Sequence, residues 1–523
     1  MKKITKILGQ VLVALLTLSL FLTGCGQPAA TNATPTPTST SSDSPSATPE
    51  VENPTAEFVK LNFYYPGSTK KELQVVNDEI NKYLKDKLNC SLAMMPIDWS
   101  VWGQKFPILL QSGEQVDLIF TSAEAQYFQN VPKNAYQPLN ALLEKYGKGI
   151  LEVINPVYLE ASKVNGELYA LGVNKDLGQS NGLFFRKDIC DKYGFDVSKV
   201  TGLEDLEPML QTIKEKEPTF VPLYMTPGYF PEFKLVLTNE LYKANRYEFN
   251  KSFRYIAFDK QTKKFVNALE IPEWVNQAKL MSSWFEKGYI NKDATTAQTN
   301  EHDTFKAGKS WMFLSTAQPG QLEFFKDKSG FDLYKVDLCD GLISTDGANG
   351  ALTAIGRTSA DPARAMMVLN LGYCDEYFIN LFHRGIEGKH YVKKSENVIS
   401  IPEGFKTWDD TGWNPSVNWE FGNQFMQYLK DTDDPQKFVK LNEYNKSLKR
   451  AELLGYYFDT TNIVTEVAAV NNAWSEYATI LGTGSSDAVE TIKKANDKMK
   501  ANGLDKIIAE FQTQYEAWAA AQK

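Results

Sequence analysis

Apolar and polar positions along the chain follow patterns typical of strands that alternate with helices. Residues 58–65 alternate in the manner of a half-buried strand, and residues 70–88 then carry apolar side chains at helical spacing. Residues 91–97 form a second apolar stretch of strand length. A strand, a connecting helix and a second strand favour parallel pairing, so the body of the chain is predicted to open with a βαβ unit.

The same alternation continues through the rest of the chain. Further strands are predicted at residues 116–121, 167–173, 181–185, 310–315 and 351–355, and helices at residues 102–112, 202–216, from Pro319, from Pro362 and over about 487–521. The buried side of the last helix is predicted to consist of Ala488, Ile492, Ala495, Met499, Leu504, Ile507 and Phe511. Because residues 56–523 are too many for one hydrophobic core, this order of elements predicts an α/β protein with two lobes.

The N-terminal residues depart from this pattern. Three lysines precede the uncharged apolar stretch 11–22, which is too short for a comfortable membrane span and is typical of a signal peptide. It ends at Leu22-Thr-Gly-Cys25, which resembles a bacterial lipobox. The resemblance implies that residues 1–24 are removed and that the Cys25 thiol is lipidated. An ordinary signal peptide with a chance cysteine is the alternative.

Residues 25–55 are dominated by Ser, Thr and Pro and cannot bury enough apolar surface to fold. We therefore expect a disordered tether between the lipidated cysteine and the folded body. Removal of residues 1–24 takes away three lysines and no acids, which changes the formal net charge from −8 to −11. Such an acidic body argues against nucleic acid as a partner and against adhesion to an anionic membrane surface.

Four cysteines remain after Cys25, and none of them stands in CxxC spacing. They are Cys90, Cys190, Cys339 and Cys374. The sequence therefore gives no support for a zinc site, and neither a metal nor a cofactor is expected. Buried free thiols are the simpler interpretation, although four cysteines also allow three complete disulfide pairings.

Eight short motifs follow one another between residues 57 and 523. In chain order they are Val116-Asp-Leu-Ile-Phe-Thr121, Asn165-Gly-Glu-Leu-Tyr-Ala170, Phe185-Arg-Lys-Asp188, Gly202-Leu-Glu-Asp-Leu206, Gly385-Ile-Glu-Gly-Lys-His-Tyr391, Trp419-Glu-Phe-Gly-Asn423, Leu481-Gly-Thr-Gly484 and Gln512-Thr-Gln514. Each motif is weak alone. Together, and behind a lipobox, they resemble the extracellular solute-binding lipoproteins of bacterial carbohydrate ABC importers, of the family 1 type and its large LplA-like subgroup.

The resemblance implies a periplasmic-binding-protein-like fold, in which two α/β lobes close on a ligand about a hinge. It places lobe 1 at residues 56–175 plus 348–455 and lobe 2 at residues 176–347 plus 456–523. It also implies a non-catalytic protein, held by its lipid on the extracytoplasmic face of the cell membrane. Such a protein is expected to be a monomer that delivers a carbohydrate to the permease subunits of an ABC importer.

Candidate ligand-binding side chains lie in loops and at strand ends, because ligands of open α/β sheets bind beyond the carboxyl ends of the strands. Aromatic rings suit the C–H faces of sugars, whereas amides, hydroxyls and carboxylates suit their hydroxyl groups. The candidates are Tyr65, Asp98, Trp99, Trp102, Thr121, Ser122, Tyr127, Tyr229, Ser315, Gln318, Glu387, Trp413, Trp419 and Asn423. We predict that they line a cleft for a neutral oligosaccharide. Core packing is the alternative for each aromatic residue, and Trp274 and Trp284 are assigned to it.

Two alternatives to a sugar-binding protein stay open. A surface glycoside hydrolase needs two suitably placed carboxylates, but the chain has no G-x-S-x-G or HExxH motif and only three histidines, His302, His383 and His390. The other alternative is the same fold with a peptide or a uronate oligomer as ligand. A uronate site requires Arg or Lys in the cleft loops, and the candidate loops carry few.

Overall fold

The computed structural model describes residues 54–522, except for residues 179, 228–245, 250–251, 339 and 416. The predictions for the signal peptide, Cys25, most of the tether, Tyr229 and Cys339 therefore lie outside the described residues. Within these ranges no helix is both long enough and apolar enough to span a membrane. Three cysteines in them are free thiols, of which Cys90 and Cys190 are buried and Cys374 is exposed.

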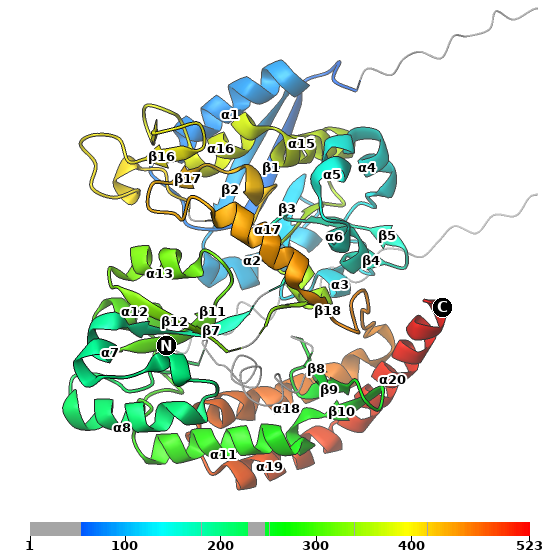
Figure 1. Cartoon of the computed structure of the whole chain (residues 1–523). Coiled ribbons are helices and arrows are strands. Elements are labelled where there is room, and N and C mark those ends of the chain that lie inside the picture. The colour runs from blue at the N-terminus through cyan, green and yellow to red at the C-terminus, as the bar shows by residue number, and fades with distance from the viewer. Residues whose placement is uncertain are drawn as a thin grey trace, which may run out of the picture. The chain divides into compact units, whose positions relative to one another are not determined.

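The predicted βαβ unit is confirmed at the start of the body. β1 (Val59–Pro66) pairs in parallel with β2 (Cys90–Ile97), and α1 (Leu73–Leu88) connects the two strands. β1 also pairs in parallel with β3 (Leu118–Thr121). All three strands therefore end at the same edge of one sheet (Figure 1).

Two strands from later in the chain complete this sheet. β14 (Leu352–Ile355) pairs antiparallel with β3, and β6 (Ala170–Gly172) pairs antiparallel with β14, which gives the order β2-β1-β3-β14-β6. α15 (Pro362–Cys374) opens at the proline predicted to start it. The Asp361 side chain caps this helix by accepting a hydrogen bond from the backbone N–H of Arg364 at 2.8 Å.

Helices pack on this sheet and on one another to form the body that we call lobe 1. α4 (Asn140–Tyr146) and α5 (Lys148–Val153) pack against α15, and α16 (Glu376–Arg384) packs against α1. Sheet and helices enclose one hydrophobic core, whose members come from residues 61–177 and 343–454. The lobe boundaries given above stay a prediction.

A second, smaller sheet is built from the middle of the chain. β7 (Asn181–Arg186) lies between the antiparallel strands β11 (Met312–Thr316) and β12 (Leu333–Asp337), and Leu183, Phe185 and Leu314 are buried in a separate core. Two expectations about helices beside it are wrong in detail. The helix expected from residue 202 begins at Glu207 as α8 (Glu207–Lys216), after a short 3-10 turn. The helix expected from Pro319 begins after Gly320 as α13 (Gln321–Ser329).

The C-terminal residues form two helices where one was predicted. α19 (Ala488–Ala501) ends before Gly503, whose φ of 103° is a left-handed conformation that favours glycine, and α20 (Leu504–Ala521) follows directly. The seven residues predicted to be buried along this stretch are all buried, in a core shared with α18 (Val464–Thr483). Trp274 and Trp284 of α11 (Pro272–Glu286) are buried as well.

The remaining strands and helices complete the described part of the chain. The strands are β4 (Lys163–Val164), β5 (Glu167–Leu168), β8 (Tyr247–Phe249), β9 (Ile256–Asp259), β10 (Lys264–Asn267), β13 (Leu342–Ile343), β15 (Val392–Lys393), β16 (Val398–Ser400), β17 (Leu429–Lys430) and β18 (Lys449–Arg450). The helices are α2 (Trp99–Gln111), α3 (Tyr127–Asn130), α6 (Pro156–Ala161), α7 (Lys187–Tyr193), α12 (Glu301–Lys306), α14 (Thr345–Ala348) and α17 (Lys437–Ser447).

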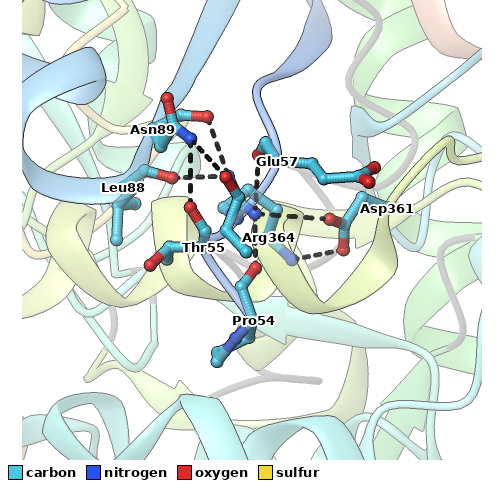
Figure 2. A network of polar contacts seen from close by, with 8 residues as sticks. Pro54, Thr55, Glu57, Leu88, Asn89, Asp361 and Arg364 are labelled. Carbon is cyan, nitrogen blue, oxygen red and sulfur yellow. Dashed lines mark hydrogen bonds and ion pairs between the residues drawn. The ribbon is translucent and has the colours of Figure 1, made fainter. Parts of the chain in front are cut away.

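A buried arginine ties the start of the described chain to lobe 1. The Arg364 guanidinium, on α15, donates to four backbone carbonyls, those of Leu88, Asn89, Pro54 and Glu57 (Figure 2). The residue is 1 % exposed. Because a guanidinium carries five N–H donors in a fixed fork, one side chain can hold segments from three parts of the chain together. We call this arrangement the Arg364 clasp.

We expect Arg364→Met to lower the free energy of unfolding by about 3 kcal/mol, because the substitution leaves buried carbonyls without donors. Urea denaturation of residues 54–523, followed by tryptophan fluorescence, measures the change. Arg357→Met is the matched control, since Arg357 is exposed in the same lobe, and it should change stability by less than about 0.5 kcal/mol. Equal unfolding free energies for R364M and the wild type would contradict the clasp.

Candidate functional site

The candidate site begins where β2 ends and α2 starts. The Asp98 carboxylate accepts hydrogen bonds from the Ser100 backbone N–H at 2.9 Å and from the Ser100 hydroxyl at 2.6 Å. These bonds cap the helix and lower the pKa of Asp98. The cap fixes Trp99 as the first residue of α2, at the edge of the sheet where the parallel strands end. Asp98 thus has a structural role, and its role in ligand binding stays a prediction.

Trp99, Trp102, Phe120 and Trp419 form an aromatic cluster at this edge, which we call the tryptophan shelf. The rings of Trp99 and Trp419 stack with 6.1 Å between centroids and 16° between planes, and Phe120 packs edge-on against both. Trp102 is buried against Phe120. Trp99 is 50 % exposed. The shelf therefore offers a supported, solvent-accessible indole at the edge where ligands of α/β sheets bind.

A buried carboxyl group follows directly after the shelf in the chain. Glu420 is 1 % exposed, and neither of its carboxyl oxygens has a hydrogen-bond partner among the described residues. Burial raises the pKa of Glu420 to about 9, so the group is neutral at pH 7. Burial and the nearby Glu420 in turn raise the pKa of Tyr65, at the end of β1. The carboxyl group therefore lies near the same edge of the sheet as the shelf.

Glu420 was not among the site residues predicted from sequence. An acidic residue in a sequence carries no mark of burial, and most such residues are exposed. The signal that was available is its position between Trp419 and Asn423, two predicted ligand residues in one motif.

Two other predicted residues bond to the segment that leads from β6 to β7. The Asn174 amide donates to Oδ1 of Asn423 at 3.1 Å, and the Gln318 amide donates to Asp176 at 3.5 Å. Lys175 and Asp176 form an ion pair at 3.0 Å, with side chains that are 7 % and 11 % exposed. Because buried polar groups paired in this way fix the backbone between them, the segment is a defined connection between lobe 1 and the loop after β11.

Most of the remaining predicted residues are buried. These are Tyr65, Thr121, Ser122, Tyr127, Ser315 and Trp413. Thr121 shares a hydrogen bond of 3.1 Å with the Tyr136 hydroxyl, and the Tyr127 hydroxyl donates to the Ser162 carbonyl at 2.7 Å. Glu387 is exposed in the loop after α16. The structure therefore brings the predicted residues Trp99, Trp102 and Trp419 together in the shelf. Tyr65 lies near Glu420. Thr121 and Tyr127 instead form hydrogen bonds within lobe 1.

Comparisons with known proteins show which class of proteins this chain resembles. Residues 452–520 match a family model described as "Domain of unknown function (DUF3502)". A protein of Streptococcus pneumoniae serotype 4 (strain ATCC BAA-334 / TIGR4), described as a carbohydrate ABC transporter substrate-binding protein, is 26 % identical over 470 residues. The match covers 88 % of this chain and 91 % of that protein. The resemblance to the solute-binding proteins of carbohydrate importers is confirmed.

Among solved structures, the chain is similar to the N-glycan transport solute binding protein NgtS from Streptococcus pneumoniae. The crystal structure of NgtS has a TM-score of 0.78 and 25 % identity, over 89 % of this chain and 100 % of NgtS. The structure of NgtS in complex with Man5GlcNAc has a TM-score of 0.74 and 25 % identity, over 89 % and 99 % of the two chains. The predicted two-lobe fold of solute-binding proteins is therefore confirmed.

We expect Glu420→Gln to stabilise the protein at neutral and alkaline pH. A carboxyl whose pKa is raised by folding contributes stability below its unfolded pKa, near 4.5, and this contribution is lost as the pH rises toward about 9. The variant lacks this titration, so at pH 8 its unfolding free energy should exceed that of the wild type by more than about 1 kcal/mol. Urea denaturation between pH 5 and pH 9 measures the difference. A difference that does not grow with pH would show that Glu420 is ionised in the folded protein.

Proposed function

We propose that this protein captures a neutral oligosaccharide outside the cell and delivers it to the permease of an ABC importer. The S. pneumoniae relative is described as a carbohydrate ABC transporter substrate-binding protein, and NgtS has been solved with Man5GlcNAc. The two-lobe fold supports closure of the lobes around the ligand as the mechanism. Binding is followed by transfer to the permease and not by chemical change.

The tryptophan shelf is the observation in this molecule that carries the proposal. Exposed tryptophan surface is unfavourable in water, and stacking of a sugar ring removes both the indole and the C–H face of the sugar from solvent. Trp419 and Phe120 fix the Trp99 ring, so little side-chain freedom is lost on binding. A flat, uncharged surface of this kind suits a glycan better than it suits an ion.

Two of the three histidines, His383 and His390, are poorly suited to acid–base catalysis in a hydrolase. Burial lowers the pKa of His390 to about 4 and that of His383 to about 3, so both are neutral at pH 7. Nδ1 of His390 accepts a hydrogen bond from the Ile386 backbone N–H at 2.9 Å, and His383 bonds to the Phe421 carbonyl at 3.1 Å. These contacts support structural roles for both rings.

We infer that Cys25 carries the lipid that holds the protein on the outer face of the cell membrane. The lipobox-like Leu22-Thr-Gly-Cys25 and the Ser-, Thr- and Pro-rich residues that follow support this inference. A protein that serves a permease from outside the cell gains a high local concentration from such an anchor.

We expect Trp99→Ala and Trp419→Ala to weaken the binding of Man5GlcNAc by at least about tenfold, because each removes part of the stacking surface. Isothermal titration calorimetry of residues 54–523 measures the affinity. Trp518→Ala is the matched control, since Trp518 lies on α20 and packs against another core. Unchanged affinity in both shelf variants, with wild-type melting temperatures, would exclude the shelf as the binding surface.

We expect Cys25→Ser to release the protein from the membrane, because serine provides no thiol for acylation. Expression of the full chain in a bacterial host, with fractionation and metabolic labelling by a fatty-acid analogue, measures anchoring. Cys374→Ser is the control, since its thiol is exposed and is predicted to have no part in anchoring. A C25S protein that stays labelled and in the membrane fraction would disprove the anchor.

A further inference from the structure

Glu420 combines nearly complete burial with two carboxyl oxygens that lack hydrogen-bond partners among the described residues. Burial of a polar group without a partner is unfavourable, and buried polar groups in folded proteins are nearly always hydrogen-bonded. A buried carboxyl group of this kind, next to the surface proposed to bind sugar, is therefore a candidate to form hydrogen bonds with the ligand.

The backbone around Glu420 runs from the shelf into the core of lobe 1. On one side Trp419 stacks on Trp99, which is half exposed. On the other side Phe421 is buried, with its ring centroid 5.2 Å from that of Phe63 in β1. Glu420 lies between these two anchors in the chain, so packing on both sides holds its backbone next to the shelf.

Among the described residues no salt bridge reaches Glu420, and neither of its carboxyl oxygens is hydrogen-bonded. Tyr65 on β1 is the titratable side chain whose pKa responds to Glu420. Burial alone accounts for the raised pKa of Glu420. The carboxyl group is therefore held neutral by its surroundings and not by a charged neighbour.

We propose that Glu420 is a ligand-binding residue, which as a neutral carboxylic acid hydrogen-bonds a neutral sugar stacked on the tryptophan shelf. The inference rests on the proposed function. The acid O–H donates to one sugar oxygen while the carbonyl oxygen accepts from a neighbouring hydroxyl, so the group matches a pair of adjacent hydroxyls. An ionised carboxylate has acceptors only. A neutral acid supplies no positive charge, so this group does not offset the cost of removing a charged uronate from water.

Three forms of residues 54–523, namely the wild type, Glu420→Gln and Glu420→Ala, distinguish this role from others, with Man5GlcNAc as the probe in calorimetry at pH 7. The amide of Glu420→Gln has one donor side and one acceptor side, like a neutral acid, so its affinity should lie within about threefold of the wild type. Glu420→Ala removes both the donor and the acceptor, so its affinity for Man5GlcNAc should fall at least about tenfold. Between pH 7 and pH 10 the wild type should weaken as the acid ionises, and E420Q should not.

Each outcome separates this inference from the proposed function. If the wild type binds neither Man5GlcNAc nor any other neutral glycan in a matched titration series, the proposed function itself is wrong. If the wild type binds and E420A binds equally well, the function stands and the role of Glu420 is wrong. If E420Q loses as much affinity as E420A, the residue acts as a carboxylate and the neutral-acid role is wrong.

A spectroscopic measurement on the folded wild type covers the case in which E420A does not fold. Infrared difference spectra should show the C=O stretch of a protonated carboxyl group that is absent from E420Q. Addition of Man5GlcNAc should shift this band, because the group forms hydrogen bonds to the ligand. A band that stays in place while calorimetry shows binding would overturn the proposal.

Discussion

The parallel pairing of β1 with β2 and β3 is the constraint on which the candidate site depends. It brings the ends of three strands to one edge of a sheet, and each end then contributes one part of the site. Trp99 follows β2, and Phe120 lies in β3. Tyr65 lies at the end of β1, near Glu420. A register shift of one residue would turn Phe120 to the opposite face of the sheet and remove its edge-on support of Trp99 and Trp419.

Local features of the molecule were predictable from sequence because they depend on neighbouring residues. The opening βαβ unit, the start of α15 at Pro362 and the buried side of the C-terminal helices all follow from apolar spacing and local turn chemistry. The break at Gly503 was missed, because apolar spacing continues across it and one glycine is a weak signal inside a helical pattern.

Long-range features were not predictable in the same way. Trp99 and Trp419 were each identified as candidates, but their stacking joins residues far apart in the chain and follows from how α15, α16 and the loops after them pack on the sheet. The buried state of Glu420 arises from the same packing. Thr121 and Tyr127 were chosen for their position near a strand end, yet they bond to Tyr136 and to the Ser162 carbonyl inside lobe 1.

The Arg364 clasp would have a mechanical consequence under the lipid anchor proposed at Cys25. A pull transmitted through the residues before Pro54 meets the guanidinium and the carbonyls of Leu88 and Asn89 before it can reach β1. Such a load would be shared between α1 and α15, two helices of lobe 1. Lys175 and Asp176 take no part in these bonds, so the clasp would carry the load without involving the segment between β6 and β7.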